Sequence, residues 1–88
     1  MKLNDLTKIG FREESTNNGI AFLDIVDETD NNVFLQISTR DTDVYPILIV
    51  NQYDWNDMRS NEVCLPMPSV KTIEDLIIKI EQLKLMFI

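Results

Sequence analysis

Histidine is absent from this chain of 88 residues, and cysteine occurs once, at Cys64. Histidine is the most common general acid-base residue and metal ligand, and a lone cysteine cannot form an internal disulfide. The two glycines form no glycine-rich phosphate loop, and no run approaches the 18 apolar residues of a membrane span. We therefore expect a non-enzymatic protein without cofactor or metal, located in a reducing compartment such as the cytoplasm.

Cys64 lies between Val63 and Leu65 in an apolar run. This setting favours a small buried side chain over a nucleophile, because a nucleophilic thiol needs a neighbouring base. A calcium loop starting at Asp27 has the wrong spacing, since its sixth residue is Asn32 and its twelfth is Ser38. An EF-hand requires glycine and glutamate at those places.

The chain length predicts a single domain, residues 1–88, with a modest core. Its hydrophobic content of 44% and charged content of 26% are typical of a folded domain. The clearest helical pattern lies in residues 69–88, where Thr72 is a suitable N-cap with Asp75 three residues later. Five apolar residues share one face of this helix: Ile73, Leu76, Ile77, Ile80 and Leu83.

A shorter helix is expected over residues 3–9, with Asn4, alone or with Asp5, capping its first turn. Gly10 occupies the position where a left-handed residue ends a helix, and Phe11 would then pack back on the helix in a Schellman motif.

Short strands separated by polar turns are expected between the two helices. Their apolar runs and alternation place them at residues 12–16, 20–26, 33–39, 44–53 and 62–65. Because the turns are short, neighbouring strands should pair. The predicted fold class is therefore α+β, a four- to five-stranded antiparallel meander with the C-terminal helix packed on one face and a short N-terminal helix.

The net charge of −7 is concentrated in the predicted sheet. Residues 13–62 contain eleven acidic residues and two arginines, a balance of −9. Such a surface repels nucleic acid and attracts a basic surface. We expect no direct nucleic-acid binding and no membrane partner. The expected partner is a basic nucleic-acid-binding protein, with carboxylates taking the place of phosphates, unless the acidic turns serve only solubility.

The candidate partner-binding residues come from the polar turns. The loop after the fourth predicted strand places Tyr53 and Trp55 among acidic residues, and both are residue types enriched at binding hot spots. Alternatively, Trp55 folds back over the edge of the sheet. The full candidate set is Asp27, Glu28, Asp30, Asp41, Asp43, Tyr53, Asp54, Trp55 and Asp57.

The segment Ile9-Gly10-Phe11, the polar strands and the closing helix with Ile73, Leu76, Ile77 and Ile80 resemble the layout of small phage and prophage proteins of unknown function. Proteins of this size and charge from such sources include inhibitors of host defence, among them anti-CRISPR proteins. The resemblance therefore implies an inhibitor that acts in the host cytoplasm on a target such as a CRISPR effector or its RNA complex.

Residues 27–52, with Asn32-Val33, Ser38 and Tyr45-Pro46, are also similar to the later strands of phage uracil-DNA glycosylase inhibitors, which are acidic DNA mimics. That family places an edge strand, with helical segments before and after it, ahead of these strands. This chain has only residues 12–16 there, so no functional residue is carried over.

A second class of function stays open. The tail over residues 83–88 is apolar, and it either folds onto the core or forms a contact between two copies. In the latter case the protein would be a structural or regulatory homodimer.

Overall fold

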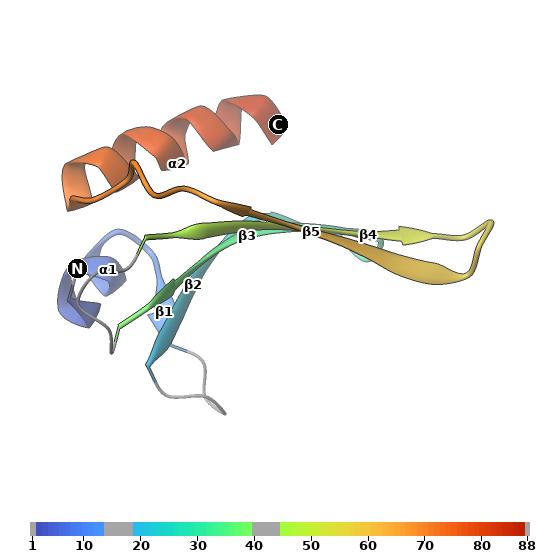
Figure 1. Cartoon of the computed structure of the whole chain (residues 1–88), viewed down its shortest axis with the longest axis horizontal. Coiled ribbons are helices and arrows are strands. Elements are labelled where there is room, and N and C mark those ends of the chain that lie inside the picture. The colour runs from blue at the N-terminus through green and yellow to red at the C-terminus, as the bar shows by residue number, and fades with distance from the viewer. Residues whose placement is uncertain (1, 14–18, 40–44, 88) are drawn as a thin grey trace.

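The computed structural model describes residues 2–13, 19–39 and 45–87. The protein has one antiparallel sheet of five strands, in the order β1-β2-β3-β4-β5 (Figure 1). One helix precedes these strands in the sequence and one follows them. This meander confirms the predicted α+β fold. The elements are α1 (Leu3–Lys8), β1 (Arg12–Glu13), β2 (Ile20–Asp27), β3 (Asn31–Ser38), β4 (Ile47–Asp54), β5 (Arg59–Pro66) and α2 (Ile73–Phe87).

Helix α2 begins as its sequence predicts. The Asp75 backbone N–H donates to Thr72 Oγ1 at 3.1 Å, and the Lys71 N–H donates back to the Asp75 carboxylate at 3.4 Å. The first bond satisfies a donor that a helix start leaves unpaired, and the second ties the residue before the cap to the first turn. The buried face of α2 then presents Leu76 and Ile80 to the sheet, and its closest approach is to β2.

Helix α1 ends in the predicted Schellman motif. The Phe11 N–H donates to the Leu6 carbonyl at 3.0 Å, and the Gly10 N–H donates to the Thr7 carbonyl at 3.2 Å. Gly10 has φ +107°, and a Cβ there would lie 3.1 Å from Leu23 Cδ1. The backbone conformation therefore favours glycine, and a Cβ would in addition press on the Leu23 side chain.

The expected cap at Asn4 is wrong. The helix begins at Leu3, so Lys2 holds the N-cap position and makes no capping bond through its side chain. Asn4 lies within the first turn instead, where its carbonyl accepts a 3.0 Å hydrogen bond from Thr7 Oγ1.

Both helices cover the same face of the sheet, because residues from each belong to one buried cluster. In β3 the predicted alternation is confirmed, since Val33, Leu35 and Ile37 are buried on this face. β2 has apolar residues on both parities because its register with β3 shifts between Asp24 and Val26. This irregularity returns Val26 to the helix side.

The last strand differs from its prediction. A loop was expected over residues 54–61, but the turn is short and β5 already begins at Arg59. Asp54 closes the turn with its side chain, and Met58 adopts φ +55°, so the polar residues that follow join the ladder. Every residue of β5 is exposed, and the expected burial of Cys64 is wrong because this strand forms an edge of the sheet.

Neither of the two helices in the described part of the chain has the length and apolar character needed to cross a membrane.

The packing of α2 predicts a large contrast between two leucines of the same helix. Leu76 is fully buried, whereas Leu85 is 85% exposed. Leu76→Ala should lower the free energy of unfolding by about 2–5 kcal/mol because it leaves a cavity. Leu85→Ala should change it by less than about 0.5 kcal/mol. Urea denaturation followed by circular dichroism measures both, and equal effects would contradict this packing.

Candidate binding surface at one end of the sheet

The face of the sheet turned away from the helices carries aromatic and amide side chains. Phe34 lies on this face of β3, and its ring meets Phe22 of β2 edge-on with centroids 6.5 Å apart. Asn32 and Asn51 are paired across β3 and β4 on the same face. In the described part of the chain no helix covers these side chains, so they are available to a partner.

Two acidic turns meet at one end of this sheet. The β2–β3 turn contains Glu28 and Asp30, and the β4–β5 turn contains Trp55 and Asp57. In an antiparallel meander, alternate turns lie at the same end. The Tyr53 N–H donates to the Asp30 carbonyl at 2.9 Å, which joins the two turns directly.

The β2–β3 turn is closed by backbone and amide hydrogen bonds. The Glu28 N–H donates to the Asn31 carbonyl at 3.1 Å. In the orientation that satisfies its amide, the Asn32 nitrogen lies 3.2 Å from Asp27 Oδ1 and 3.2 Å from the Glu28 carbonyl. The Asp27 carboxylate thus stabilises the turn. The carboxylates of Glu28 and Asp30 are exposed and make no hydrogen bond or ion pair within the described residues.

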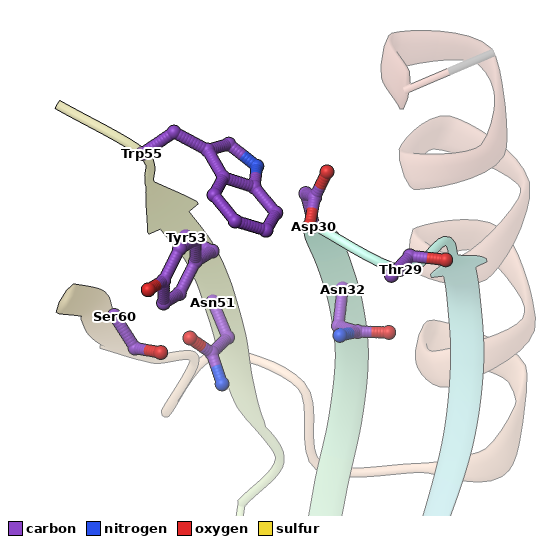
Figure 2. A pocket seen from close by; sticks show the side chains of 7 residues that line it. All are labelled: Thr29, Asp30, Asn32, Asn51, Tyr53, Trp55 and Ser60. Atoms are coloured by element: carbon purple, nitrogen blue, oxygen red, sulfur yellow. The ribbon is translucent and has the colours of Figure 1, made fainter. Parts of the chain in front are cut away.

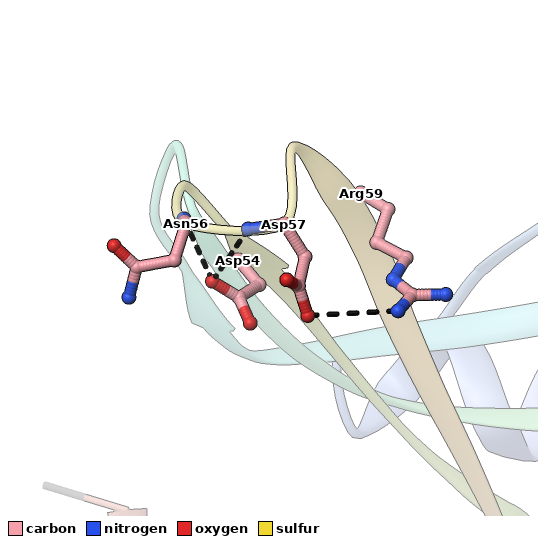
Figure 3. Close-up of polar contacts among 4 residues, drawn as sticks. All are labelled: Asp54, Asn56, Asp57 and Arg59. Carbon is pink, nitrogen blue, oxygen red and sulfur yellow. Dashed lines mark hydrogen bonds and ion pairs between the residues drawn. The ribbon is translucent and has the colours of Figure 1, made fainter.

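The β4–β5 turn is organised by Asp54 (Figure 3). Its Oδ1 accepts the backbone N–H of Asn56 at 2.8 Å and that of Asp57 at 3.3 Å. This is an Asx-type turn. The Asp57 carboxylate lies 3.5 Å from the Arg59 guanidinium, and both side chains are mostly exposed. Such a pair adds little stability, so Arg59 remains accessible to water and other ions.

Tyr53 and Trp55 form one wall of a shallow pocket between the two turns (Figure 2). Their ring centroids are 4.7 Å apart at an interplanar angle of 71°. Figure 2 shows the indole of Trp55 extending from β4 toward Asp30. The pocket holds about 210 Å³ and is lined by Thr29, Asp30, Asn32, Asn51, Tyr53, Trp55 and Ser60.

A second pocket of about 270 Å³ continues along the same face. It shares Asn32 and Asn51 with the first pocket. Two residues that line this second pocket, Asp24 and Phe22, hold Arg12. Its Nη2 lies 2.7 Å from Asp24 Oδ2, and its Cζ lies 4.3 Å from the Phe22 ring centroid. The lining residues are Phe22, Asp24, Asn32, Phe34, Gln36 and Asn51.

Seven of the nine predicted binding residues gather at this end of the sheet. They are Asp27, Glu28, Asp30, Tyr53, Asp54, Trp55 and Asp57. Asp41 and Asp43 lie outside the described residues. Trp55 lies against Tyr53 of β4 at the end of the sheet, while 61% of its side chain stays exposed.

The sequence prediction missed Thr29 of the β2–β3 turn and three polar strand residues of the first pocket, which are Asn32, Asn51 and Ser60. Their strand parity was the available signal, because each occupies the same face as Tyr53 once the strands are paired. For Ser60 this signal was hidden, since residues 54–61 were expected to form a loop.

The described residues provide few side chains suited to metal binding or nucleophilic catalysis. Among residues 2–13, 19–39 and 45–87, no three carboxylate or thiol side chains are grouped to hold a metal ion. The Cys64 Sγ donates a 3.5 Å hydrogen bond to Glu62 Oε1. Desolvation of the thiolate by adjacent atoms, and then the hydrogen bond to and charge of Glu62, raise the pKa of the Cys64 thiol. A raised pKa lowers the thiolate fraction at neutral pH and so makes the thiol a poor nucleophile.

Comparisons with models of known families, with characterised proteins and with solved structures find no match to the chain.

The contact between Glu62 and Cys64 predicts how fast the thiol reacts. Glu62→Gln removes the neighbouring charge, so the pKa of Cys64 should fall and its reaction with iodoacetamide at pH 8 should become faster. The rate measured from pH 7 to 10 should show a midpoint at lower pH than in the wild type. Glu74→Gln, which removes the same charge from exposed α2, should leave this profile unchanged. Identical profiles for both variants would contradict the role of Glu62.

Proposed function

We propose that the protein is a non-enzymatic, phage-type inhibitor that binds a basic nucleic-acid-handling protein of the host, such as a CRISPR effector nuclease. The observation that carries this proposal is the gathering of two acidic turns around an aromatic pair, the half-buried Tyr53 and the exposed Trp55. Acidic groups attract a basic surface, and an exposed tryptophan gives such a contact an apolar anchor.

The charge at this end of the sheet supports the proposal. Glu28 and Asp30 have no cationic partner in the described chain, and the cation nearest in sequence to Trp55, Arg59, pairs with Asp57. Lys8 belongs to α1, which Figure 1 shows at the other end of the molecule from the β4–β5 turn. The molecule therefore presents a negative end to an approaching partner, and this polarity steers association.

The shape of the hairpin suggests how binding would inhibit. Figure 1 shows β4 and β5 extending beyond the helices, with their turn at the tip. A narrow acidic tip can enter a groove that normally holds a nucleic-acid backbone, where its carboxylates replace phosphates. The host cytoplasm is the compartment that this proposal requires.

Reversing the free charges should abolish binding. In Glu28→Lys with Asp30→Lys, two unpaired carboxylates of the β2–β3 turn become cations, while Asp27 is kept because it supports the turn. The matched control, Glu74→Lys with Glu81→Lys, changes net charge equally on exposed positions of α2. Each tagged protein is incubated with a nuclease-treated bacterial lysate at two salt concentrations, and bound proteins are identified by mass spectrometry.

The wild type and the α2 control should both retain a nucleic-acid-binding protein, less of it at high salt, and the turn variant should lose it. Purified wild-type protein should then displace labelled nucleic acid from that target. Equal retention by the turn variant, or a target that keeps its nucleic acid, would contradict the proposal.

A second candidate function, a homo-oligomerisation module, is favoured by the edge strand β5. At the other edge of the sheet, the described part of β1 consists of two residues, both charged and exposed. β5 has eight residues, and on its helix side Val63 is 51% and Leu65 is 48% exposed. A long, partly apolar edge can pair with the same strand of a second copy.

One antiparallel register of two β5 strands is self-complementary. If Cys64 lies opposite its counterpart, Val63 faces Leu65 of the other copy twice, and Glu62 faces Pro66 rather than another carboxylate. β5 carries one arginine and one glutamate, so its edge is neutral within an acidic protein. Apolar cross-strand pairs of this kind stabilise a sheet.

For this second candidate, light scattering after size-exclusion chromatography should show a dimer that Leu65→Lys converts to a monomer. Leu85→Lys, at an exposed position of α2, serves as the control and should remain dimeric. If instead Leu85→Lys is monomeric and Leu65→Lys remains dimeric, the contact lies on the apolar C-terminal tail. A monomeric wild type would exclude this function.

A further inference from the structure

We propose that the pocket between Tyr53, Trp55 and Asp30 binds the guanidinium group of an arginine side chain on the partner. This inference rests on the proposed function, because it names the group through which a basic partner would be held. The chemistry that the pocket presents is an aromatic pair on one side and a carboxylate on the other.

The lining of the pocket matches a planar cation. A guanidinium is attracted to the face of an aromatic ring and also forms hydrogen bonds with a carboxylate. Trp55 is 61% exposed, so its ring is accessible, and its edge-to-face contact with Tyr53 holds it beside the pocket. The Asp30 carboxylate has no partner within the described residues, so it can accept the cation without losing another bond.

On the same face of the sheet, an arginine of the chain itself already contacts an aromatic ring and a carboxylate. Arg12 stacks over Phe22, with its Cζ 4.3 Å from the ring centroid, and bonds Asp24 at 2.7 Å. In the pocket at the end of the sheet, aromatic rings and an aspartate recur, and no cation of the described chain occupies it. The arrangement at Arg12 therefore shows that a guanidinium can satisfy a ring and a carboxylate on this surface together.

The arginine cannot come from the adjacent strand. Arg59 pairs with Asp54 in the β4–β5 register, which places it on the opposite face from Tyr53 and Ser60. Its guanidinium also lies 3.5 Å from Asp57, outside the residues that line the pocket. Lysine suits the pocket less well than arginine, because an ammonium is compact and strongly hydrated, whereas a guanidinium is flat and stacks.

The test compares two peptides of equal charge, hexa-arginine and hexa-lysine, each with a fluorescent label. Binding to the full chain is followed by fluorescence anisotropy at low salt. For the wild type, hexa-arginine should bind about three- to tenfold more tightly than hexa-lysine, since a flat, weakly hydrated guanidinium can stack on the ring while it bonds the carboxylate, whereas an ammonium is compact and strongly hydrated. In Trp55→Ala and in Asp30→Asn this ratio should fall to about one.

Two further variants separate the pocket from general charge attraction. Glu28→Gln removes one carboxylate from the same turn but none from the pocket lining, so it should weaken both peptides and leave their ratio unchanged. Trp55→Phe keeps a ring and should retain part of the preference. Since Trp55 is the only tryptophan, its emission should also shift with hexa-arginine in the wild type.

Each failure has its own result. If both peptides bind with equal affinity, or if the ratio survives in Trp55→Ala and Asp30→Asn, the guanidinium pocket is wrong while the acidic binding surface stands. If neither peptide binds, the attraction of a basic partner is also wrong, and the proposed function fails with it.

Discussion

One helical layer covers one face of a five-stranded sheet, and the rest of the surface follows from this constraint. Leu76 and Ile80 of α2 and Leu6 of α1 pack against the same side, so the hydrophobic core is built there. The described chain has no second layer for the other face. That face therefore keeps a mixture of half-buried rings, such as Phe34, and amides, such as Asn51. A protein of this size can bury only a limited area, so this face stays uncovered in the described chain.

The open face gains its character from the turns at one end. Antiparallel pairing brings the β2–β3 and β4–β5 turns together, and the hydrogen bond from Tyr53 to Asp30 holds them in place. Some acidic residues in these turns stabilise the fold; Asp54, for example, closes its turn with a hydrogen bond. The side chains of others, including Glu28 and Asp30, make no such bond in the described chain. Unpaired carboxylates beside an exposed Trp55 suit recognition of a cation better than they suit stability, and this distinction supports the proposed binding surface.

Local patterns in the sequence were sufficient to predict the helices and much of the sheet. The Schellman ending at Gly10 and the cap at Thr72 depend on a few neighbouring residues, so they could be recognised without the fold. The start of β5 could not, because polar residues from Arg59 onward become a strand only when β4 provides the ladder. The contact of Arg12 with Phe22 joins residues ten positions apart through strand pairing. Likewise, the charge pattern of the sequence indicated which turns were acidic. That these turns meet around Trp55 could be seen only once the register of the strands was known.

The proposed binding surface is best tested by mapping where an arginine-rich peptide binds on the whole chain. Nuclear magnetic resonance of the ¹⁵N-labelled protein, titrated with hexa-arginine, reports on each backbone amide and on the Trp55 indole N–H. We expect the largest shifts in the two turns, at residues 28–32 and 53–60, and in that indole. Shifts centred on the helix-facing side of β5 or on the outer face of α2 would contradict the assignment of the binding surface to this end of the sheet.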